Sequence, residues 1–360
     1  MKAAVLREIP SELVIDEVQI DQPGPREVLV NTAAAGVCHS DLHFMEGKYP
    51  YPTPTVLGHE SAGVVEAVGS DVTYVKPGDH VITCLSVFCG SCEFCTSGRP
   101  SLCTKEGLTR PPEGPQRLSK DGGPLFQFLH LSSFAEQMLV HEHALVKIRD
   151  EMPLDRAALI GCGVTTGLGA VFNTAKVGAG ETVAVLGAGG IGLNAIQGAA
   201  IAGAGRIIAV DMNEMKLELA KSFGATDLVN AGDGDPVAQV MELTGGGVHH
   251  AFEAIGLKVT AEQAFLMLRS GGTATVIGMV PLGQNVELPG YMFLSEKKIQ
   301  GSNMGSNRFR TDMPRYVDMY LNGKLKLDEL VSARRPLEEI NEAFTAMKSG
   351  EVARSVITFD

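Results

Sequence analysis

The stretch TVAVLGAGGIG, residues 182–192, decides the fold of this chain. Its first five residues, Thr182–Leu186, are apolar or β-branched and predict a buried strand, and the glycines that follow predict a tight turn opening a helix. Such glycines let the backbone approach a pyrophosphate, and the helix N-terminus attracts its negative charge. The predicted dinucleotide loop consists of Gly187, Gly189, Gly190, Ile191 and Gly192.

An acidic residue follows the glycine loop at the distance that is typical of a dinucleotide-binding fold. Asp211 lies nineteen residues beyond Gly192 and follows the next predicted strand, Arg206–Val210. A carboxylate at this place accepts hydrogen bonds from the diol of an adenosine ribose and repels a 2′-phosphate. The sequence therefore predicts binding of NAD rather than NADP.

Further apolar runs alternate with helical stretches after this motif. Runs at 227–230, 250–255 and 273–279 read as strands separated by helices. This alternation is typical of βαβ units, so we expect a doubly wound parallel sheet with helices on both faces.

The regions before and after this alternating segment show different residue patterns. Short β-type runs, which include 27–31, 61–68 and 80–85, predict a mostly antiparallel β region in the first 150 or so residues. Helical stretches around 314–321 and 337–348 and a short strand at 354–359 are predicted after Gly301. A parallel sheet inserted into another domain explains this order. The segment 104–124, rich in Gly, Pro and charge, is predicted to be a long surface loop.

Composition excludes several classes of protein. The 360 residues suggest roughly two domains. A net charge of −12 disfavours nucleic acid and anionic membrane surfaces as partners. The uncharged stretch 182–205 is interrupted by glycines, which favours strand, turn and helix over a membrane span. Charges early in the chain disfavour a signal peptide, so we expect a cytoplasmic protein.

Four of the seven cysteines fall within fifteen residues: Cys89, Cys92, Cys95 and Cys103. Four thiolates so close in sequence can surround one tetrahedral Zn²⁺. An iron–sulfur cluster is the main alternative, although its usual run places the fourth cysteine three residues on and before a proline. Unpaired buried thiols are a further alternative. Because four thiolates leave no open position, this zinc is expected to be structural.

A second possible metal set is dispersed along the chain: Cys38, His59 and Cys162. Two thiolates and one imidazole around Zn²⁺ would leave a fourth position for water or substrate, which is the form of a catalytic site. Spacing alone does not establish that the three residues meet, and single His and Cys residues are common in protein cores.

With these three motifs in this order, the whole chain resembles the zinc-dependent medium-chain alcohol dehydrogenases. The resemblance implies a GroES-like, mostly β catalytic domain interrupted by a Rossmann domain. The implied catalytic domain is 1–163, with its structural-zinc lobe at 86–104, completed by 304–360, and the implied NAD-binding domain is 164–303. It also implies two zinc ions per chain and a homo-oligomer, dimer or tetramer.

Residue roles follow from the matching motifs. The resemblance makes Cys38, His59 and Cys162 ligands of the catalytic zinc, with Glu60 behind the metal and Asp41 orienting the ligand histidine. The residues implied to contact the cofactor, besides the loop and Asp211, are His39, Thr166, Lys216 and Arg354. Lys216 and Arg354 could instead be ordinary surface charges.

The implied reaction is hydride transfer between an alcohol and NAD. Zinc acts as a Lewis acid that lowers the pKa of a bound hydroxyl. Ser40 matches the hydroxyl that bonds the reacting oxygen, and His43 the histidine that passes the proton to water, unless His43 is only a surface imidazole. By family position Leu85, Phe134 and Met279 line an apolar substrate pocket that suits primary aliphatic or aromatic alcohols and their aldehydes, although plain core packing explains each of them equally well.

Other activities remain open. Cys162 favours the alcohol branch over the polyol dehydrogenases. Glutathione-dependent formaldehyde dehydrogenases carry acidic residues shortly after the first ligand motif and lack the relay histidine, whereas this chain has Lys48, retains His43 and has a shortened loop after Cys103. A formaldehyde dehydrogenase acting on another thiol adduct is an alternative. A zinc-free quinone or enoyl reductase and a non-enzymatic zinc- and nucleotide-binding protein rank lower, because neither needs Cys38, His59 and Cys162 together.

Overall fold

The computed structural model describes residues 1–111, 113–350 and 353–359, which form two compact units. Unit 1 comprises Met1–Cys162 and Arg308–Asp360, and unit 2, inserted between them in the chain, is Gly163–Asn307. The sequence prediction divided the domains after residues 163 and 303. Each unit is described below by itself.

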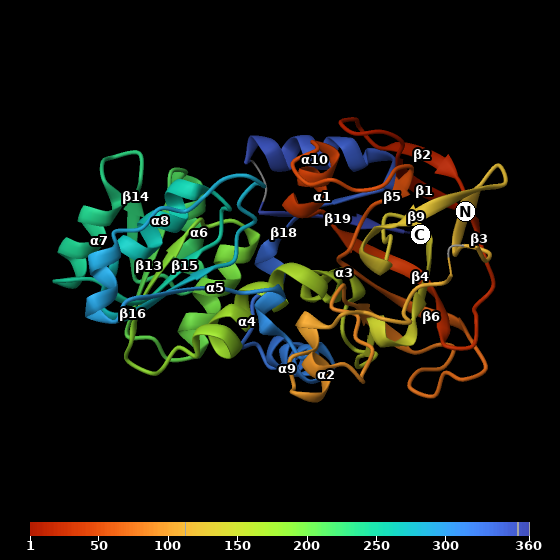
Figure 1. Cartoon of the computed structure of the whole chain (residues 1–360), viewed down its shortest axis with the longest axis horizontal. Helices are drawn as coiled ribbons and strands as arrows, with labels where there is room; N and C mark the ends of the chain where they lie inside the picture. Colours follow the sequence, from red (N-terminus) through yellow and green to blue (C-terminus); the bar gives the residue numbers. More distant parts are fainter. Residues whose placement is uncertain (112, 351–352, 360) are drawn as a thin grey trace. The chain divides into compact units, whose positions relative to one another are not determined.

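Unit 2 contains one wholly parallel sheet (Figure 1). Its strand order is β14 (Asp227–Asn230), β13 (Arg206–Asp211), β12 (Thr182–Leu186), β15 (Val248–Glu253), β16 (Leu268–Val276) and β17 (Lys298–Gly301). The helices that pack against it are α5 (Gly190–Ile201), α6 (Glu214–Ser222), α7 (Pro236–Thr244) and α8 (Lys258–Leu266). Strand β12 lies inside the sheet and is buried on both faces, which explains its uninterrupted apolar run.

The strand order of this sheet reverses at β12. The chain runs from β12 outward to β13 and β14, then returns to place β15 on the other side of β12. Leu186 is in register with Val210 on one side and with Glu253 on the other. The glycine loop after Leu186 therefore lies at the switch point, where doubly wound sheets bind their ligands.

Unit 1 is built from two mostly antiparallel sheets. The first has the order β2 (Val14–Glu17), β1 (Lys2–Leu6), β5 (Thr55–Val56), β9 (Gly123–Gln127), β8 (Leu118–Lys120) and β3 (Gln19–Ile20). The second has the order β11 (Leu145–Lys147), β7 (His80–Thr83), β6 (Ser61–Val68), β4 (Glu27–Gly36), β19 (Arg354–Thr358) and β18 (Val331–Arg335), with β10 (Gln137–His141) paired to β4. Strands β18 and β19, which come after residue 308, thus complete a sheet whose other strands come from the first part of the chain.

The helices of unit 1 are short except near the C-terminus. They are α1 (His39–Met45), α2 (Glu93–Thr96), α3 (Leu154–Leu159), α9 (Phe309–Leu321) and α10 (Ile340–Ser349). Helix α10 buries Ile340, Phe344 and Met347 in the same apolar cluster as Leu42 and Met45 of α1. The predicted fold class, a GroES-like β domain with an inserted Rossmann sheet, is confirmed.

A helical run at 154–175 was not predicted. It continues from α3 through the π-helix η4 (Ile160–Val164), α4 (Thr165–Gly169) and the π-helix η5 (Ala170–Ala175). Its glycines and threonines have low helix propensity, so the sequence pattern did not indicate a helix. A Cβ on Gly167 would lie 2.6 Å from the Cβ of Asn194, so tight packing against α5 requires glycine there. Leu154–Ala175 has the length and hydropathy of a membrane span, but 83% of its apolar window is buried inside the protein.

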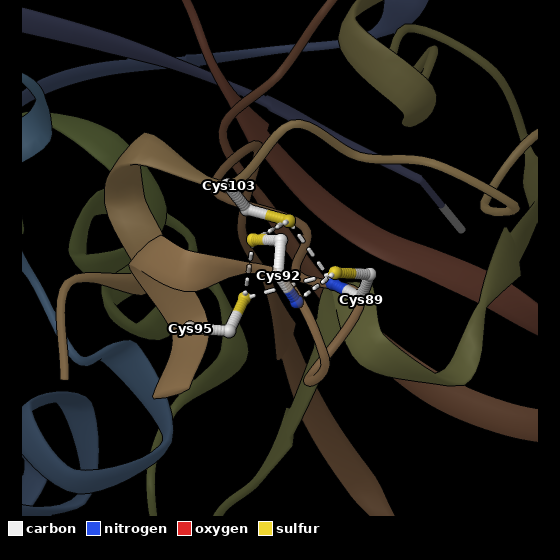
Figure 2. Close-up of side chains that lie close together, drawn as sticks. All are labelled: Cys89, Cys92, Cys95 and Cys103. Atoms are coloured by element: carbon white, nitrogen blue, oxygen red, sulfur yellow. Dashed lines mark hydrogen bonds between the residues drawn. The ribbon is translucent and has the colours of Figure 1, made fainter. Parts of the chain in front are cut away.

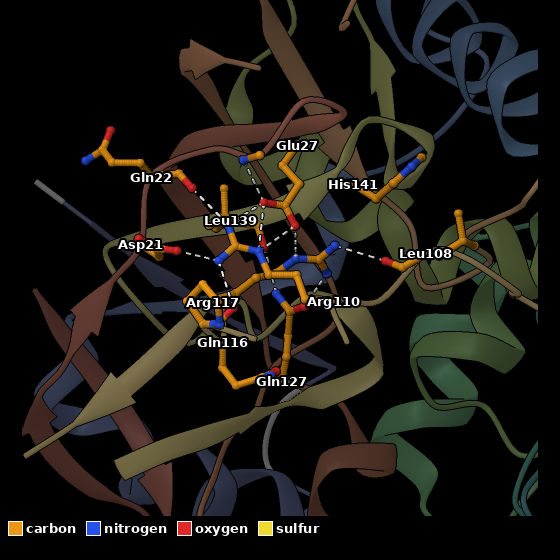
Figure 3. A network of polar contacts seen from close by, with 12 residues as sticks. Asp21, Gln22, Glu27, Leu108, Arg110, Gln116, Arg117, Gln127, Leu139 and His141 are labelled. Carbon is orange, nitrogen blue, oxygen red and sulfur yellow. Dashed lines mark hydrogen bonds and ion pairs between the residues drawn. The ribbon is translucent and has the colours of Figure 1, made fainter. Parts of the chain in front are cut away.

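The predicted surface loop at 104–124 is only partly a loop. Strand β8 and the start of β9 form a hairpin at its end. Arg117, 6% exposed, donates to Glu27, Gln127 and the carbonyl of Leu108 in a network of buried polar contacts (Figure 3). Composition predicted exposure because glycine, proline and charge are usually solvated, but Arg110 and Arg117 pair with Glu27, which lies outside this segment.

Candidate metal and cofactor sites

Three residues far apart in the sequence meet inside unit 1. Cys38 precedes α1, His59 precedes β6, and Cys162 lies in η4. One ligand atom from each, together with a carboxylate oxygen of Glu60, all lie within 4.8 Å of one another. All four side chains are buried, with at most 4% of any one exposed. The predicted convergence of Cys38, His59 and Cys162 is therefore present in the structure.

Two glycines make this convergence sterically possible. Gly58, at φ +93°, leaves no room for a Cβ, which would lie 2.5 Å from the backbone nitrogen of Phe134. A Cβ on Gly36 would lie 2.5 Å from a carboxylate oxygen of Glu60. Each glycine lies next to or near a ligand, so the close approach of the backbone is part of how the site is built.

The His59 ring is oriented from within α1. Its Nδ1 is 3.1 Å from Oδ1 of Asp41, and the same oxygen accepts the N–H of Gly58 at 3.1 Å. The other ring nitrogen, Nε2, is buried and has no hydrogen-bond partner among the described residues. A buried nitrogen without a partner, facing two sulfurs, has the chemistry of a metal ligand, and the carboxylate on Nδ1 sets its tautomer.

The electrostatics favour a cation here. The Cys162 thiol and the His59 imidazole hold the pKa of Cys38 well below its ordinary value, against burial. Burial tends to lower the pKa of His59, but Asp41 and Cys38 raise it well above its usual range. The group thus combines thiolate character with a buried imidazole, and this donor set fits Zn²⁺ with one open position.

The four remaining clustered cysteines form a second group in unit 1. Their sulfurs point toward one another, and Cys92 lies 3.5 Å from Cys95 and 3.8 Å from Cys103, sulfur to sulfur (Figure 2). The Cys89 and Cys95 sulfurs are 3.9 Å apart. A regular tetrahedron of sulfurs about 2.3 Å from a zinc has edges of about 3.8 Å, so the group fits that ion without rearrangement.

Backbone N–H groups surround these sulfurs. The amides of Cys89 and Lys105 donate to Cys103 at 3.1 and 3.2 Å, and the amide of Cys92 donates to Cys89 at 3.3 Å. Hydrogen bonds from Ser91 and Cys92 lower the pKa of Cys89 to about 6. Helix α2 buries none of its residues, so apolar packing does little to hold it. Four thiolates around one ion would leave no open position for a substrate.

The glycine loop of unit 2 has the tight geometry that the sequence predicted. Gly187 has φ +94° and donates its N–H to the carbonyl of Val210 at 2.8 Å. A Cβ on Gly192 would lie 1.7 Å from the carbonyl oxygen of Gly187, so no other residue fits there. By contrast, open space surrounds Gly189 at the N-cap of α5, where a phosphate could meet the helix terminus.

Asp211 lies beside this loop at the carboxyl end of β13. One of its oxygens accepts the N–H of Ala188 at 2.8 Å, and the other accepts that of Asn213 at 3.0 Å. Each oxygen retains a lone pair with which a ribose hydroxyl could bond. Lys216 is half-buried in the first turn of α6, five residues further on.

Known proteins match both units. A family model for the alcohol dehydrogenase GroES-like domain matches residues 24–150, and one for zinc-binding dehydrogenases matches 190–321. The class-3 alcohol dehydrogenase of Drosophila melanogaster is 42% identical, with 99% of this chain and 97% of that protein covered. The chain belongs to the zinc-dependent medium-chain alcohol dehydrogenases.

Two further members of this alcohol dehydrogenase family are similar over their full length. An S-(hydroxymethyl)glutathione dehydrogenase of Photobacterium damsela subsp. piscicida is 42% identical, with 98% of this chain and 97% of that protein covered. The crystal structure of benzyl alcohol dehydrogenase from Acinetobacter calcoaceticus matches with a TM-score of 0.94 at 36% identity, covering 100% of this chain and 99% of that one. The chain is thus similar to family members named for different substrates.

Arg354, which by its resemblance to the family is predicted to contact a phosphate of the cofactor, lies in unit 1 and is only 6% exposed. Its guanidinium donates to both carboxylate oxygens of Glu60. Burial raises the pKa of Glu60 to about 7, and Arg354 opposes that rise. The predicted phosphate contact remains a prediction, and the structure adds a partner that the sequence did not indicate.

The other predicted residues lie on α1 and α4. His39 is exposed at the start of α1, and Ser40 follows with its Oγ 3.7 Å from the Cys38 sulfur. His43 is half-buried, stacks on Tyr49 at 6.2 Å, and has no hydrogen-bond partner for its Nδ1 among the described residues. Thr166 is buried in α4 of unit 2, and its hydroxyl lies 3.4 Å from the Met304 sulfur. Their functional roles remain predictions.

The predicted pocket residues lie in different surroundings. Phe134 is fully buried in the core of unit 1 and packs edge-on to Phe344 at 6.0 Å, and its pocket role stays a prediction. Leu85 is partly buried beside the core of unit 1, and Met279 lies in unit 2 after β16. An aromatic ring that the prediction did not include lies beside a predicted metal ligand: Phe128 is 6.0 Å from the His59 ring. The sequence carried no signal for it beyond an ordinary apolar residue.

Proposed function

We propose that this protein is an NAD-dependent alcohol dehydrogenase that holds one zinc at Cys38, His59 and Cys162 and interconverts primary alcohols with their aldehydes. The observation that supports it most is the meeting of these residues with the imidazole Nε2 left without a hydrogen-bond partner. The four-cysteine group is proposed to hold a second, structural zinc.

When bound, zinc would polarise the alcohol oxygen as a Lewis acid, and NAD would accept the hydride. The residues of this chain would hold the zinc, orient its histidine ligand and transfer the proton. Asp41 fixes the His59 tautomer through Nδ1. Ser40 Oγ is proposed to accept the hydroxyl proton of the alcohol while it passes its own proton on toward His43, and His43 to release a proton to water. Burial and the neighbouring Lys48 lower the pKa of His43, which favours release of a proton from its ring.

The proposed cofactor contacts in unit 2 would together bind a dinucleotide that has no 2′-phosphate. The loop between Gly187 and Gly192 and the N-terminus of α5 would take the pyrophosphate. Asp211 would bind the ribose diol, and Lys216 would lie nearby. A small-molecule alcohol or aldehyde is the proposed partner of the complete site.

The experiment is a substrate panel run with NAD and with NADP on protein of measured zinc content. Short aliphatic alcohols, benzyl alcohol and their aldehydes are compared in both directions. We expect NAD-linked turnover of primary alcohols with little activity on NADP. Turnover of none of these substrates by zinc-replete protein would contradict the proposal.

A second candidate is oxidation of a thiol adduct of formaldehyde. It is favoured by the 42% identity to the Photobacterium protein named S-(hydroxymethyl)glutathione dehydrogenase. Formaldehyde is assayed with NAD, alone and after adding glutathione or another small thiol. Turnover that requires a thiol, and exceeds turnover of every alcohol, would favour this candidate.

We also propose that the protein forms a homo-oligomer through unit 2. Strand β17 is an edge of the parallel sheet, and the turn η6 (Gly290–Ser295) precedes it. Tyr291 and Leu294 in that turn are 74% and 89% exposed, and Leu282 is 66% exposed. An apolar surface beside an open sheet edge favours pairing with another copy of the chain.

A further inference from the structure

The backbone of unit 1 is strained at one place near the metal-ligating residues. Leu129, His130 and Ser132 have φ of 48°, 67° and 60°, in the left-handed region that side chains other than glycine rarely adopt. Such conformations persist only where surrounding contacts hold them, and they often mark functional segments. The segment Phe128–Ser132, here called the strained turn, includes the short helix η2 (Phe128–His130).

The Tyr51 hydroxyl bonds to the backbone on both sides of Phe128, at the start of this turn. It donates to the carbonyl of Gln127 at 3.0 Å and accepts the N–H of Leu129 at 3.1 Å. Ser132 adds a second tie, since its Oγ accepts the N–H of Phe128 at 2.8 Å and donates to the carbonyl of Val56 at 2.7 Å. The turn is thus fastened to the segment that leads from Tyr51 toward His59.

The strained turn places one ring against His59. Phe128 is fully buried, and its ring meets the imidazole edge-on, 6.0 Å away at 66°. The rings of Phe44 and Tyr51 also pack on Phe128, each with its centroid 4.9 Å from that of Phe128. Phe128 cannot shift without moving these rings, so both the ring packing and the backbone of the turn hold its contact with His59.

Contacts of two kinds therefore constrain the His59 ring. Asp41 acts on Nδ1 by a hydrogen bond, and Phe128 packs against the ring itself. Groups that orient a ligand histidine influence how tightly the metal is held. A phenylalanine at position 51 would supply the same ring packing. The presence of a tyrosine there therefore points to a role for its hydroxyl group, which ring packing does not require.

We propose that Tyr51 is a positioning residue of the metal site: its hydroxyl holds the strained turn, and the turn keeps Phe128 packed against His59. This inference rests on the proposed function only in taking His59 as a zinc ligand. It requires no particular alcohol substrate.

The test compares wild-type protein with Tyr51→Phe, using a chelator to follow release of each zinc and hydrogen exchange to follow the Leu129 amide. We expect zinc at Cys38, His59 and Cys162 to leave about tenfold faster in the variant, because loss of a group that orients a ligand histidine typically weakens metal binding by about tenfold or more. The Leu129 amide should exchange faster, and the zinc of the four-cysteine group should leave at the wild-type rate.

A matched control and a rescue separate this role from general destabilisation. Tyr74→Phe also removes a hydroxyl that accepts a backbone N–H, that of Lys147 at 3.3 Å, and should change neither zinc release nor Leu129 exchange. His130→Asn places a residue that tolerates left-handed backbone in the strained turn. Combined with Tyr51→Phe, it should restore part of the slow zinc release.

Three results would overturn the proposal. They are unchanged zinc release in Tyr51→Phe, faster Leu129 exchange without faster zinc release, and equal acceleration of both zinc ions. Failure of the proposed function has a different signature, which is zinc-replete wild-type protein that oxidises no alcohol with NAD. The positioning role could then still hold, because its readouts are metal release and amide exchange.

Discussion

Asp211 is the residue on which the proposed choice of nucleotide depends. Its two oxygens accept backbone N–H groups from Ala188 and Asn213, which fixes the carboxylate beside the glycine loop. A fixed negative charge there favours a ribose diol and repels a phosphate on the same hydroxyl.

Asp211→Ser should therefore raise the KM for NAD about tenfold or more, since a hydrogen bond to a charged group is worth about 1.5–3 kcal/mol. The KM for NADP should fall, because the repulsion is removed. Initial rates with both nucleotides measure the change. Asp233→Ser, an exposed position in the same unit, is the control and should leave both values unaltered. An unchanged ratio of NAD to NADP efficiency in Asp211→Ser would show that this carboxylate does not select the nucleotide.

At the scale of elements, the four-cysteine lobe is the segment most dependent on metal. Helix α2 has four residues and buries none of them, so apolar packing contributes little to its stability. The sulfurs already lie at distances that suit a tetrahedral zinc. Metal binding is therefore expected to supply the folding free energy of this segment.

Cys95→Ser should lower the zinc content from two ions to one per chain and make the lobe sensitive to protease, while the other zinc stays bound. Metal analysis and limited proteolysis measure both effects. Cys84→Ala is the matched control, because Cys84 is fully buried and belongs to neither metal-ligating group. Two zinc ions retained by Cys95→Ser would contradict the structural role of this site.

The loop that follows the lobe is held by charge rather than by apolar packing. Glu27 accepts hydrogen bonds from Arg110 and Arg117 and is 6% exposed (Figure 3). Burial alone would raise the pKa of Glu27, but the two arginines lower it to about 2 from an ordinary 4.5. Such a shift corresponds to a stability contribution on the order of 3 kcal/mol.

Because the folded-state pKa of Glu27 is depressed, this contribution is complete above about pH 4.5 and is lost as the pH falls through about 2. Glu27→Gln should therefore destabilise the protein strongly at pH 7 and flatten the acid dependence of unfolding within that window. Thermal unfolding between pH 2 and 7 measures both effects. Glu338→Gln, which breaks an exposed ion pair with Lys2, should change little. A normal acid dependence in Glu27→Gln would show that the network adds no such stability.

Elements were predictable where local pattern and tertiary role agree. Strands β12 and β14 have the predicted bounds, because apolar runs between turn signals are unambiguous in a parallel sheet. The helical run at 154–175 was hidden, since the glycines that permit its packing also lower its helix propensity. The ligands were predictable from residue type and family resemblance. Tyr51 and Phe128 were not, because nothing local distinguishes an aromatic residue that supports a ligand from one in the core.

At the scale of the whole molecule, the exposed apolar surface of unit 2 predicts assembly. Leu294→Asp places a charge in the turn beside the edge strand β17, where Leu294 is 89% exposed. The variant should shift the molecular mass in solution toward that of a single chain, as measured by light scattering. Asp233→Ser, already used as a control, should keep the wild-type mass. A wild-type protein that is monomeric at micromolar concentration would contradict this surface role.

The central claim is that Cys38, His59 and Cys162 together hold a reactive zinc. The most direct measurement is the zinc content of wild-type and Cys162→Ala protein, made alongside NAD-linked alcohol oxidation. We predict two zinc ions and turnover in the wild type, and one remaining zinc with turnover reduced about a thousandfold or more in the variant. Two zinc ions and an undiminished rate in Cys162→Ala would contradict the claim.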